Sequence, residues 1–345
     1  MRGIKKWIGN IVFLFLVLGL TLWLTFRGQD MAVLGSYLQS ASLFWVGLAV
    51  VLVVLFILSE SVIIYGFLRS AKQPSRLTHC FLYSFTGFFF CCITPSATGG
   101  QPMQAWLMKR DGISVSVSVP LLILVTILYK MVLVVIGVAV LVFQPPAVMR
   151  YLEPAIWWCW FGIVLNVVFV AFSLLLVFRP GWMRGLLRFF VNLLCRLLKR
   201  DATARLKSTD AWIDRYAAIT DCFRHDVRML IVACVITFMQ RLLLFAVTWC
   251  ACCAFGVAQS EIVLILVLQA MIAGAADMMP LPGGSGISEM LFLRIFEPLV
   301  GSALALPVMV VSRGIGFYAQ MLIGAVFTVV AVFVIKKRVR NVEEE

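Results

Sequence analysis

The sequence predicts an all-α integral membrane protein, with six full transmembrane helices and two re-entrant helical hairpins of opposite orientation that form an inverted repeat. The 345-residue chain is 63% hydrophobic, only 13% charged and has a mean hydropathy of +1.04, which excludes a water-soluble globular protein. Its apolar runs are long enough to span about 30 Å of hydrocarbon. Its basic residues gather in short segments between those runs, a pattern that orients membrane proteins.

Six apolar runs predict the full spans. The first follows the basic residues Arg2, Lys5 and Lys6, and no small-residue cleavage site comes after it, so we expect a retained helix rather than a signal peptide. The six predicted spans cover residues 7–26, 42–68, 117–143, 156–178, 228–255 and 303–335.

The basic residues assign the loops to two sides of a cell membrane. We expect both termini, the loop 69–76, the loop 109–112 and the segment 179–227 in the cytoplasm, because Lys and Arg concentrate there. The charge-poor loops are expected outside, and they cover residues 27–41, 144–155, 256–260 and 299–302.

Two further apolar regions, residues 79–108 and 261–298, are interrupted by Pro and Gly. Both flanks of the first region are assigned to the cytoplasm, and both flanks of the second to the outside. The arm 79–93 would reach only about 22 Å as a helix, which is short of a full span. Each region is therefore expected to enter and leave the membrane on one face, from opposite sides.

The order helix, hairpin, helix occurs twice, in residues 42–143 and 228–335, which predicts an inverted repeat with its ligand site between the halves. We divide the chain into an N-terminal membrane half (1–178), a linker (179–227) and a C-terminal membrane half (228–345). In the linker, basic residues recur every three or four positions against an apolar surface. This pattern predicts an amphipathic helix that lies in the cytoplasmic interface and contacts anionic lipid.

The two hairpin tips are candidate ligand sites, because irregular backbone at membrane depth is tolerated only in a protein interior or beside a wet cavity. Their polar side chains and glycine amides suit a phosphate, although the same residues could serve only to turn and pack the chain. The candidates in the first tip are Thr94, Pro95, Ser96, Thr98, Gly99, Gly100, Gln101 and Gln104. Those in the second tip are Asp277, Pro282, Gly283, Gly284, Gly286 and Glu289.

Charged residues inside the predicted spans are candidates by default, since charges in lipid need partners or water. Lys130, Arg241 and Arg313 oppose Asp277 and Glu289, which gives a net positive site suited to an anionic group. Lys130 follows Gly100 by 30 residues and Arg313 follows Gly284 by 29, in equivalent helices. Structural ion pairing between helices is the alternative. Glu60 is assigned a place nearer the end of its segment.

The sequence contains no motif for a metal, a cofactor or a nucleophile with its base, and we expect none. Nearly all of the ten cysteines lie in apolar runs and are expected to be buried thiols. The net charge of +13 is explained by membrane orientation and anionic lipid, so nucleic acid is not an expected partner.

The two tips resemble those of a known family, the transmembrane flippase region of lysylphosphatidylglycerol synthases and its stand-alone relatives. The first half of the family pattern is matched by Thr94, Pro95, Gly99, Gly100 and Pro102. The second half is matched by Pro280, Pro282, Gly283, Gly284, Gly286 and Glu289, and Arg313 matches an arginine of the last helix. Many members have charged residues at the positions of Gln101 and Gln104.

The resemblance implies a membrane protein that moves a lipid between leaflets, here a stand-alone member without the synthase domain. The expected partner is a phospholipid or a polyprenyl-phosphate lipid, and the expected function is transport rather than catalysis. Two alternatives stay open: an enzyme acting on a polyprenyl-phosphate lipid, and an accessory protein of envelope glycolipid synthesis. The sequence leaves the oligomeric state open, a homo-oligomer included.

Overall fold

The computed structural model describes residues 31–94, 96–197, 203–279, 284 and 286–335, and every regular element among them is a helix. Five helical segments are long and apolar enough to cross a membrane. They agree closely with five of the six predicted spans, whereas the predicted span 7–26 lies outside the described residues. The five are α3 (Leu43–Ser70), α6 (Val115–Phe143), the segment Pro146–Phe178 that ends in α8 (Ile156–Phe178), α11 (Val227–Ala254) and Ser302–Val334.

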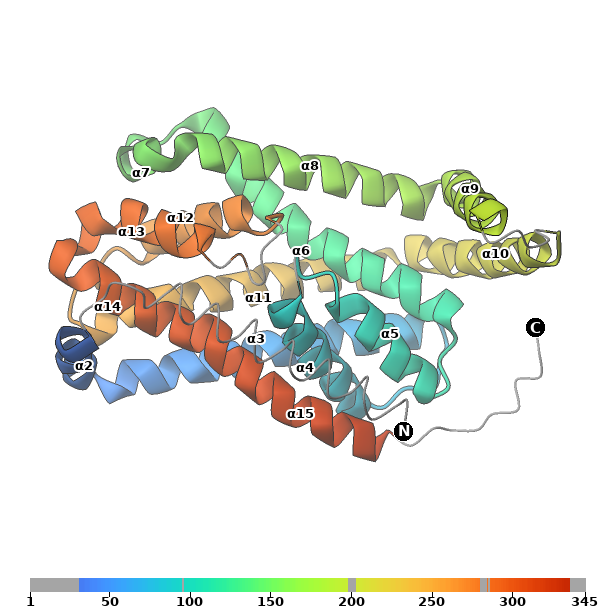
Figure 1. Ribbon diagram of the computed structural model, residues 1–345, viewed down its shortest axis with the longest axis horizontal. Coiled ribbons are helices and arrows are strands. Elements are labelled where there is room, and N and C mark those ends of the chain that lie inside the picture. The colour runs from blue at the N-terminus through green and yellow to red at the C-terminus, as the bar shows by residue number, and fades with distance from the viewer. Residues whose placement is uncertain (1–30, 95, 198–202, 280–283, 285, 336–345) are drawn as a thin grey trace.

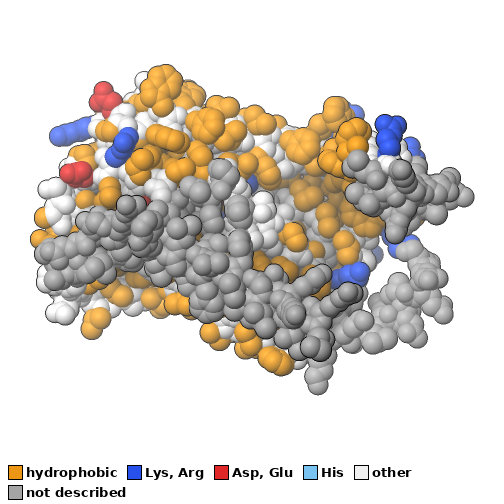
Figure 2. All heavy atoms as spheres, viewed as in Figure 1, with side chains coloured by type: hydrophobic (Ala, Val, Ile, Leu, Met, Phe, Trp, Pro, Cys, Tyr) orange, Lys and Arg blue, Asp and Glu red, His pale blue; other side chains and the backbone are white. Residues whose placement is uncertain are grey.

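The long helices run roughly along one axis of the molecule (Figure 1). Hydrophobic side chains cover most of the visible middle of that axis, and charged side chains gather at its two ends (Figure 2). An apolar belt between charged ends is the surface that a bilayer requires of a protein that spans it. The chain is therefore a helical membrane protein.

Two pairs of shorter helices fill the space between the long ones. The first helix pair is α4 (Leu77–Ile93) and α5 (Gly100–Arg110), and the second helix pair is α12 (Ile262–Ala276) and α13 (Ile287–Val300). The two helices of each pair pack against each other. The pairs start from opposite ends of the long axis, and their turns lie near its middle (Figure 1).

The two turns touch each other. The hydroxyl of Ser96, in the turn of the first helix pair, donates a hydrogen bond to the carbonyl oxygen of Met279 over 3.1 Å. The first turn thus contacts the second across 183 residues of sequence. This contact places both predicted tips at one point of the molecule.

Each helix pair packs against the last span of the opposite half. Helix α4 lies along α15 (Gln320–Val334), and α12 lies against α6 and α8, while α3 and α11 pack along each other. Gly162 allows α8 to lie close to α12, because a Cβ added at this position would be 2.4 Å from the Cα of Ala275. Helices packed this closely hold the two turns in place.

The last span is not the uniform helix that its apolar run predicts. Helix α14 (Ser302–Arg313) passes into a π-helical turn, η2 (Gly314–Ala319), before α15 begins. Turns of this type widen a helix locally and occur often at functional sites. The widened turn directly follows Arg313.

Short helices occupy two of the predicted outer loops. Residues 27–41 contain α2 (Met31–Ser40), and residues 144–155 contain α7 (Pro146–Leu152) and η1 (Glu153–Ala155). The charge-poor composition of these segments did not reveal their helical structure.

The linker forms α9 (Pro180–Leu197) and α10 (Thr203–His225). Arg188 of α9 donates to Asp210 of α10 at 2.6 and 3.0 Å, and Arg184 donates to Asp214 at 2.5 Å. The hydrogen bond from Arg188 lowers the pKa of Asp210 below its ordinary value. Two arginines that we expected to contact lipid headgroups therefore bind carboxylates of the neighbouring helix.

Candidate functional site

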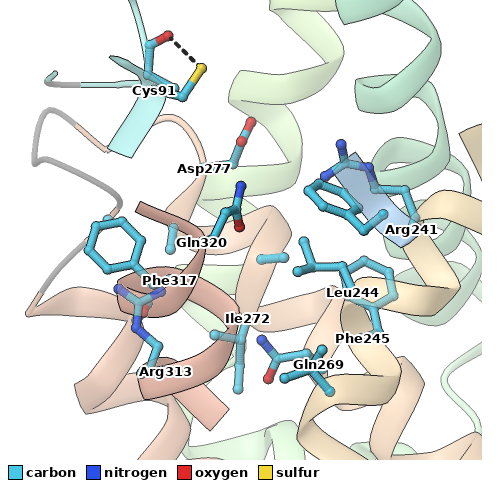
Figure 3. A pocket seen from close by; sticks show the side chains of 18 of the residues that line it. Cys91, Arg241, Leu244, Phe245, Gln269, Ile272, Asp277, Arg313, Phe317 and Gln320 are labelled. Atoms are coloured by element: carbon cyan, nitrogen blue, oxygen red, sulfur yellow. Dashed lines mark hydrogen bonds between the residues drawn. The ribbon is translucent and has the colours of Figure 1, made fainter. Parts of the chain in front are cut away.

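A cavity of about 230 Å³ lies where the two turns meet (Figure 3). It is bordered by α3, α4, α6, α11, α12, α13 and the last span, so residues from both halves of the chain contribute to it. Five of the predicted site residues line it: Ser96, Arg241, Asp277, Gly284 and Arg313.

Arg241 is the cation that the cavity leaves most available. It lies on α11 with 8% of its surface exposed, and its guanidinium is 5.0 Å from the ring centroid of Phe56 and 4.2 Å from that of Tyr129. Among the described residues its Nε is buried without a hydrogen-bond partner, and no carboxylate forms an ion pair with it. A desolvated guanidinium with free donors favours a bound anion.

Asp277, which is half-buried, and Lys130, which is buried, form an ion pair. The Lys130 ammonium donates to Asp277 and, over 3.3 Å, to Asn166 of α8, and the Tyr129 hydroxyl also donates to Asp277. Asn166 in turn donates to the carbonyl of Gly274 over 3.0 Å. Lys130 is therefore engaged in joining α6, α8 and α12, as the structural alternative predicts, and it is not among the residues that line the cavity.

Arg313, which is half-buried, and Glu289, which is buried, form the second ion pair. The Arg313 Nε donates to Glu289 over 2.9 Å, and the other carboxylate oxygen accepts the backbone N–H of Gly286 over 2.6 Å. Glu289 thus caps α13 and holds Arg313 at the same time. Arg313 and Arg241 lie on opposite sides of the cavity (Figure 3).

Most residues of the first tip hold its turn rather than line the cavity. The Thr94 hydroxyl accepts the N–H of Gly99 over 2.9 Å and donates to the carbonyl of Phe90 over 2.6 Å. Gln101 donates to Thr126 of α6. A Cβ on Gly100 would lie 2.3 Å from the sulfur of Cys91, so that glycine permits a close contact with α4.

Of the first-tip candidates that the structure describes, Ser96 alone reaches the cavity; Thr98 is not among its lining residues. Three further candidates, Pro95, Pro282 and Gly283, lie outside the described residues.

Comparison with known protein families gives a match over most of the chain. Residues 9–324 match the family model described as the lysylphosphatidylglycerol synthase TM region. The chain belongs to this family. The match includes both helix pairs and every residue that lines the cavity. A comparison with curated proteins gives no match.

Membership of this family fits a membrane lipid-related role. Several residues that contribute to this site are uncharged and were missed by sequence reasoning. Thr248 and Ser312 share a 2.7 Å hydrogen bond at the cavity wall, and Gln320 lines it as well. Gln269 also lines it, and its side-chain oxygen is buried without a partner among the described residues.

Glu60 was not among the predicted site residues, although it belongs to the same cluster. It lies in the second half of α3 with 9% of its surface exposed, and it accepts a 2.8 Å hydrogen bond from Gln104. With Glu60 included, the cations Lys130, Arg241 and Arg313 face three carboxylates, those of Glu60, Asp277 and Glu289. The net positive charge that we expected is therefore absent from this cluster, and the attraction for an anion comes from Arg241 individually.

Proposed function

We propose that the protein is a lipid flippase that moves a phosphate-bearing headgroup between leaflets without altering it chemically. The observation that carries this proposal is the cavity at the meeting point of the two turns, with Arg241 as a buried cation inside it. A lipid phosphate satisfies such a cation, because charge-assisted hydrogen bonds to Arg are among the strongest in proteins. Membership of the lysylphosphatidylglycerol synthase TM-region family supports a lipid-related role.

The proposal includes a topology in the cell membrane. The two helix pairs are re-entrant hairpins, the first entering from the cytoplasm and the second from outside, and the predicted span 7–26 gives a sixth full helix with both termini cytoplasmic. An inverted repeat is supported by the packing, since α4 lies on α15 just as α12 lies on α6. In transporters with inverted repeats, the ligand site lies between the halves near the midplane.

Transport then follows from alternate opening of the two turns. The headgroup phosphate binds Arg241, while the pairs Lys130–Asp277 and Arg313–Glu289 hold the second helix pair against α6 and α14. Separation of Ser96 from Met279 opens the cavity toward one side. The acyl chains stay in lipid, so only the polar headgroup needs the protein.

The test uses purified protein in phosphatidylcholine vesicles that contain a trace of fluorescent phosphatidylglycerol. We expect the label in the inner leaflet to become accessible to a membrane-impermeant quencher faster than in protein-free vesicles, with the lipid recovered unchanged. Fluorescent monoglucosyl diacylglycerol is the matched control, since its polar headgroup carries no phosphate for Arg241 to bind. A chemically altered phosphatidylglycerol would instead favour the enzyme alternative, and absence of exchange would contradict the proposal.

A further inference from the structure

The mechanism above leaves one buried carboxylate unused. Glu60 lies on α3 one turn after Phe56, and the ring of Phe56 faces the guanidinium of Arg241. Gln240, next to Arg241, donates to the carbonyl of Phe56 over 3.0 Å and ties α11 to α3 at this level. Glu60 and Arg241 therefore belong to one packed layer of the α3–α11 contact.

Glu60 has no ion-pair partner among the described residues. Among the described residues, its one hydrogen bond comes from the side-chain amide of Gln104. An ionised carboxylate buried with a single neutral donor is costly, and a carboxylate at membrane depth is a functional candidate by default.

Gln104 is a partner that suits both protonation states. Its amide donates to a carboxylate through Nε2 and, after rotation, accepts from a carboxylic acid through Oε1. The room for this side chain is supplied by Gly87 of α4, where an added Cβ would lie 2.2 Å from the Gln104 amide nitrogen. The layer is therefore built to keep Gln104 beside Glu60.

The charged and titratable groups around Glu60 come from several helices. Arg241 of α11 attracts its ionised form, and Cys91 on α4 is a further titratable group of its surroundings. Beyond Arg241 lie Tyr129 of α6 and Asp277 at the end of α12, and Asp277 is already occupied by Lys130. Glu60 and a bound anion would therefore compete for the same cation, Arg241.

We propose that Glu60 is a proton-binding residue, and that its ionised carboxylate and an anionic lipid headgroup alternate as the counter-charge of Arg241. This proposal rests on the proposed function for the identity of the headgroup. A headgroup on Arg241 removes the attraction that keeps Glu60 ionised, so Glu60 takes up a proton from the cytoplasmic or external water. By linkage, proton binding strengthens headgroup binding by the same factor, and lipid and proton move together.

The test is infrared difference spectroscopy of the full-length protein in phosphatidylcholine nanodiscs across a pH titration, with and without added phosphatidylglycerol. We expect a protonated-carboxyl band that is lost in Glu60→Gln and retained in Glu297→Gln, the same change at an exposed position. Phosphatidylglycerol should move the midpoint of this band to higher pH. The proposal is overturned if the protonated-carboxyl band is retained in Glu60→Gln, or if added phosphatidylglycerol does not change the pH midpoint of the band.

A transport measurement separates this proposal from the function on which it rests. Wild-type exchange of fluorescent phosphatidylglycerol should decline as pH rises, by at most about tenfold per pH unit for one linked proton, whereas Glu60→Gln should exchange at a rate independent of pH. If the infrared band of protonated Glu60 is present but no lipid exchange occurs, the flippase function is rejected and the assignment of Glu60 as a proton-binding residue stands. Exchange in Glu60→Gln with the wild-type pH profile would reject the proton site but keep the flippase.

Discussion

At the scale of single residues, ion pairing decides which buried charges can meet a ligand. Lys130 and Arg313 each hold a carboxylate of the second helix pair, whereas Arg241 holds none among the described residues. A cation already paired within the protein gains little from a new anion, because it must lose its partner first. Arg241 is therefore the residue on which anion binding should depend.

The pair Lys130–Asp277 gives a prediction about stability. Lys130→Met should lower the free energy of unfolding by about 3–5 kcal/mol, because it leaves the Asp277 carboxylate buried without its cation. The double variant Lys130→Met with Asp277→Asn should recover much of this loss. Thermal unfolding in detergent micelles measures both.

The matched control for that pair is Arg184→Met, at an exposed pair with Asp214, which should cost less than about 1 kcal/mol. Losses that simply add in the double variant would show that Lys130 and Asp277 are not coupled.

Sequence reasoning located the charged residues of the site but not their partners. Lys130, Arg241 and Asp277 are visible in the sequence because charge is rare in apolar runs. Tyr129, Gln269 and other uncharged residues carry no such signal, since nothing in a single apolar run tells which face of the helix meets the cavity. Glu60 was left out of the predicted site, because its place along the segment does not tell whether its side chain faces the protein interior.

At the scale of helices, length and hydropathy predicted five spans correctly, because both are set by the thickness of the bilayer. The turns of the helix pairs were predicted from Pro and Gly within apolar sequence. The π-helical turn after Arg313 was not predicted, since an inserted residue leaves no mark on the composition of an apolar run.

Helix approach at Gly162 gives a second prediction. Gly162→Ala should destabilise the protein by about 1–3 kcal/mol, because the added methyl group would meet the backbone of α12, including the carbonyl oxygen of Gly274 at 2.6 Å. The matched control is Gly185→Ala in α9, where nothing lies within 4 Å. That change should be neutral or slightly stabilising. Equal effects in thermal unfolding would argue against the α8–α12 contact.

The start of α11 gives a prediction about pH. Hydrogen bonds from Ser70 and from the N–H of Met229 lower the pKa of Asp226 below its ordinary value. The ionised carboxylate therefore stabilises the fold above the unfolded-state pKa of about 3.9, and this stabilisation is lost as pH falls through the lower folded-state pKa. Asp226→Ala should cost about 1 kcal/mol at neutral pH.

Unfolding measured from pH 7 downward should show a constant difference between wild type and Asp226→Ala to about pH 5 and a shrinking one below about pH 4. Asp221→Ala, at an exposed position of α10, is the control and should have little effect. A difference that grows on acidification would contradict the assigned hydrogen bonds.

At the scale of the whole molecule, the charge distribution predicts the direction in which each segment crosses the membrane, and this stays a prediction. It does not predict which helices touch. The contact between α3 and α11 and the packing of each helix pair on the opposite half depend on side-chain shape along whole helices. The charges of the loops carry no information about the shape of these side chains.

The proposed topology predicts the accessibility of the loops. Single cysteines at Lys72 and at Gly112, in a cysteine-free background, should react with an impermeant reagent only from the cytoplasmic side. Residues 69–76 and 109–112 flank the first helix pair, so a common side is what a re-entrant pair requires. A cysteine at Gln144 should react only from outside. Labelling of the cysteines at Lys72 and Gly112 from opposite sides would contradict the re-entrant topology of the first helix pair.

The central claim is that an anionic headgroup crosses the membrane through the cavity at Arg241. The most direct measurement is exchange of fluorescent phosphatidylglycerol in vesicles containing Arg241→Gln, with Arg228→Gln on the exposed part of the same helix as control. We predict an exchange rate about 10- to 100-fold below wild type for Arg241→Gln, since a charge-assisted hydrogen bond contributes about 1.5–3 kcal/mol, and a wild-type rate for Arg228→Gln. Wild-type exchange in a folded Arg241→Gln protein would contradict the account.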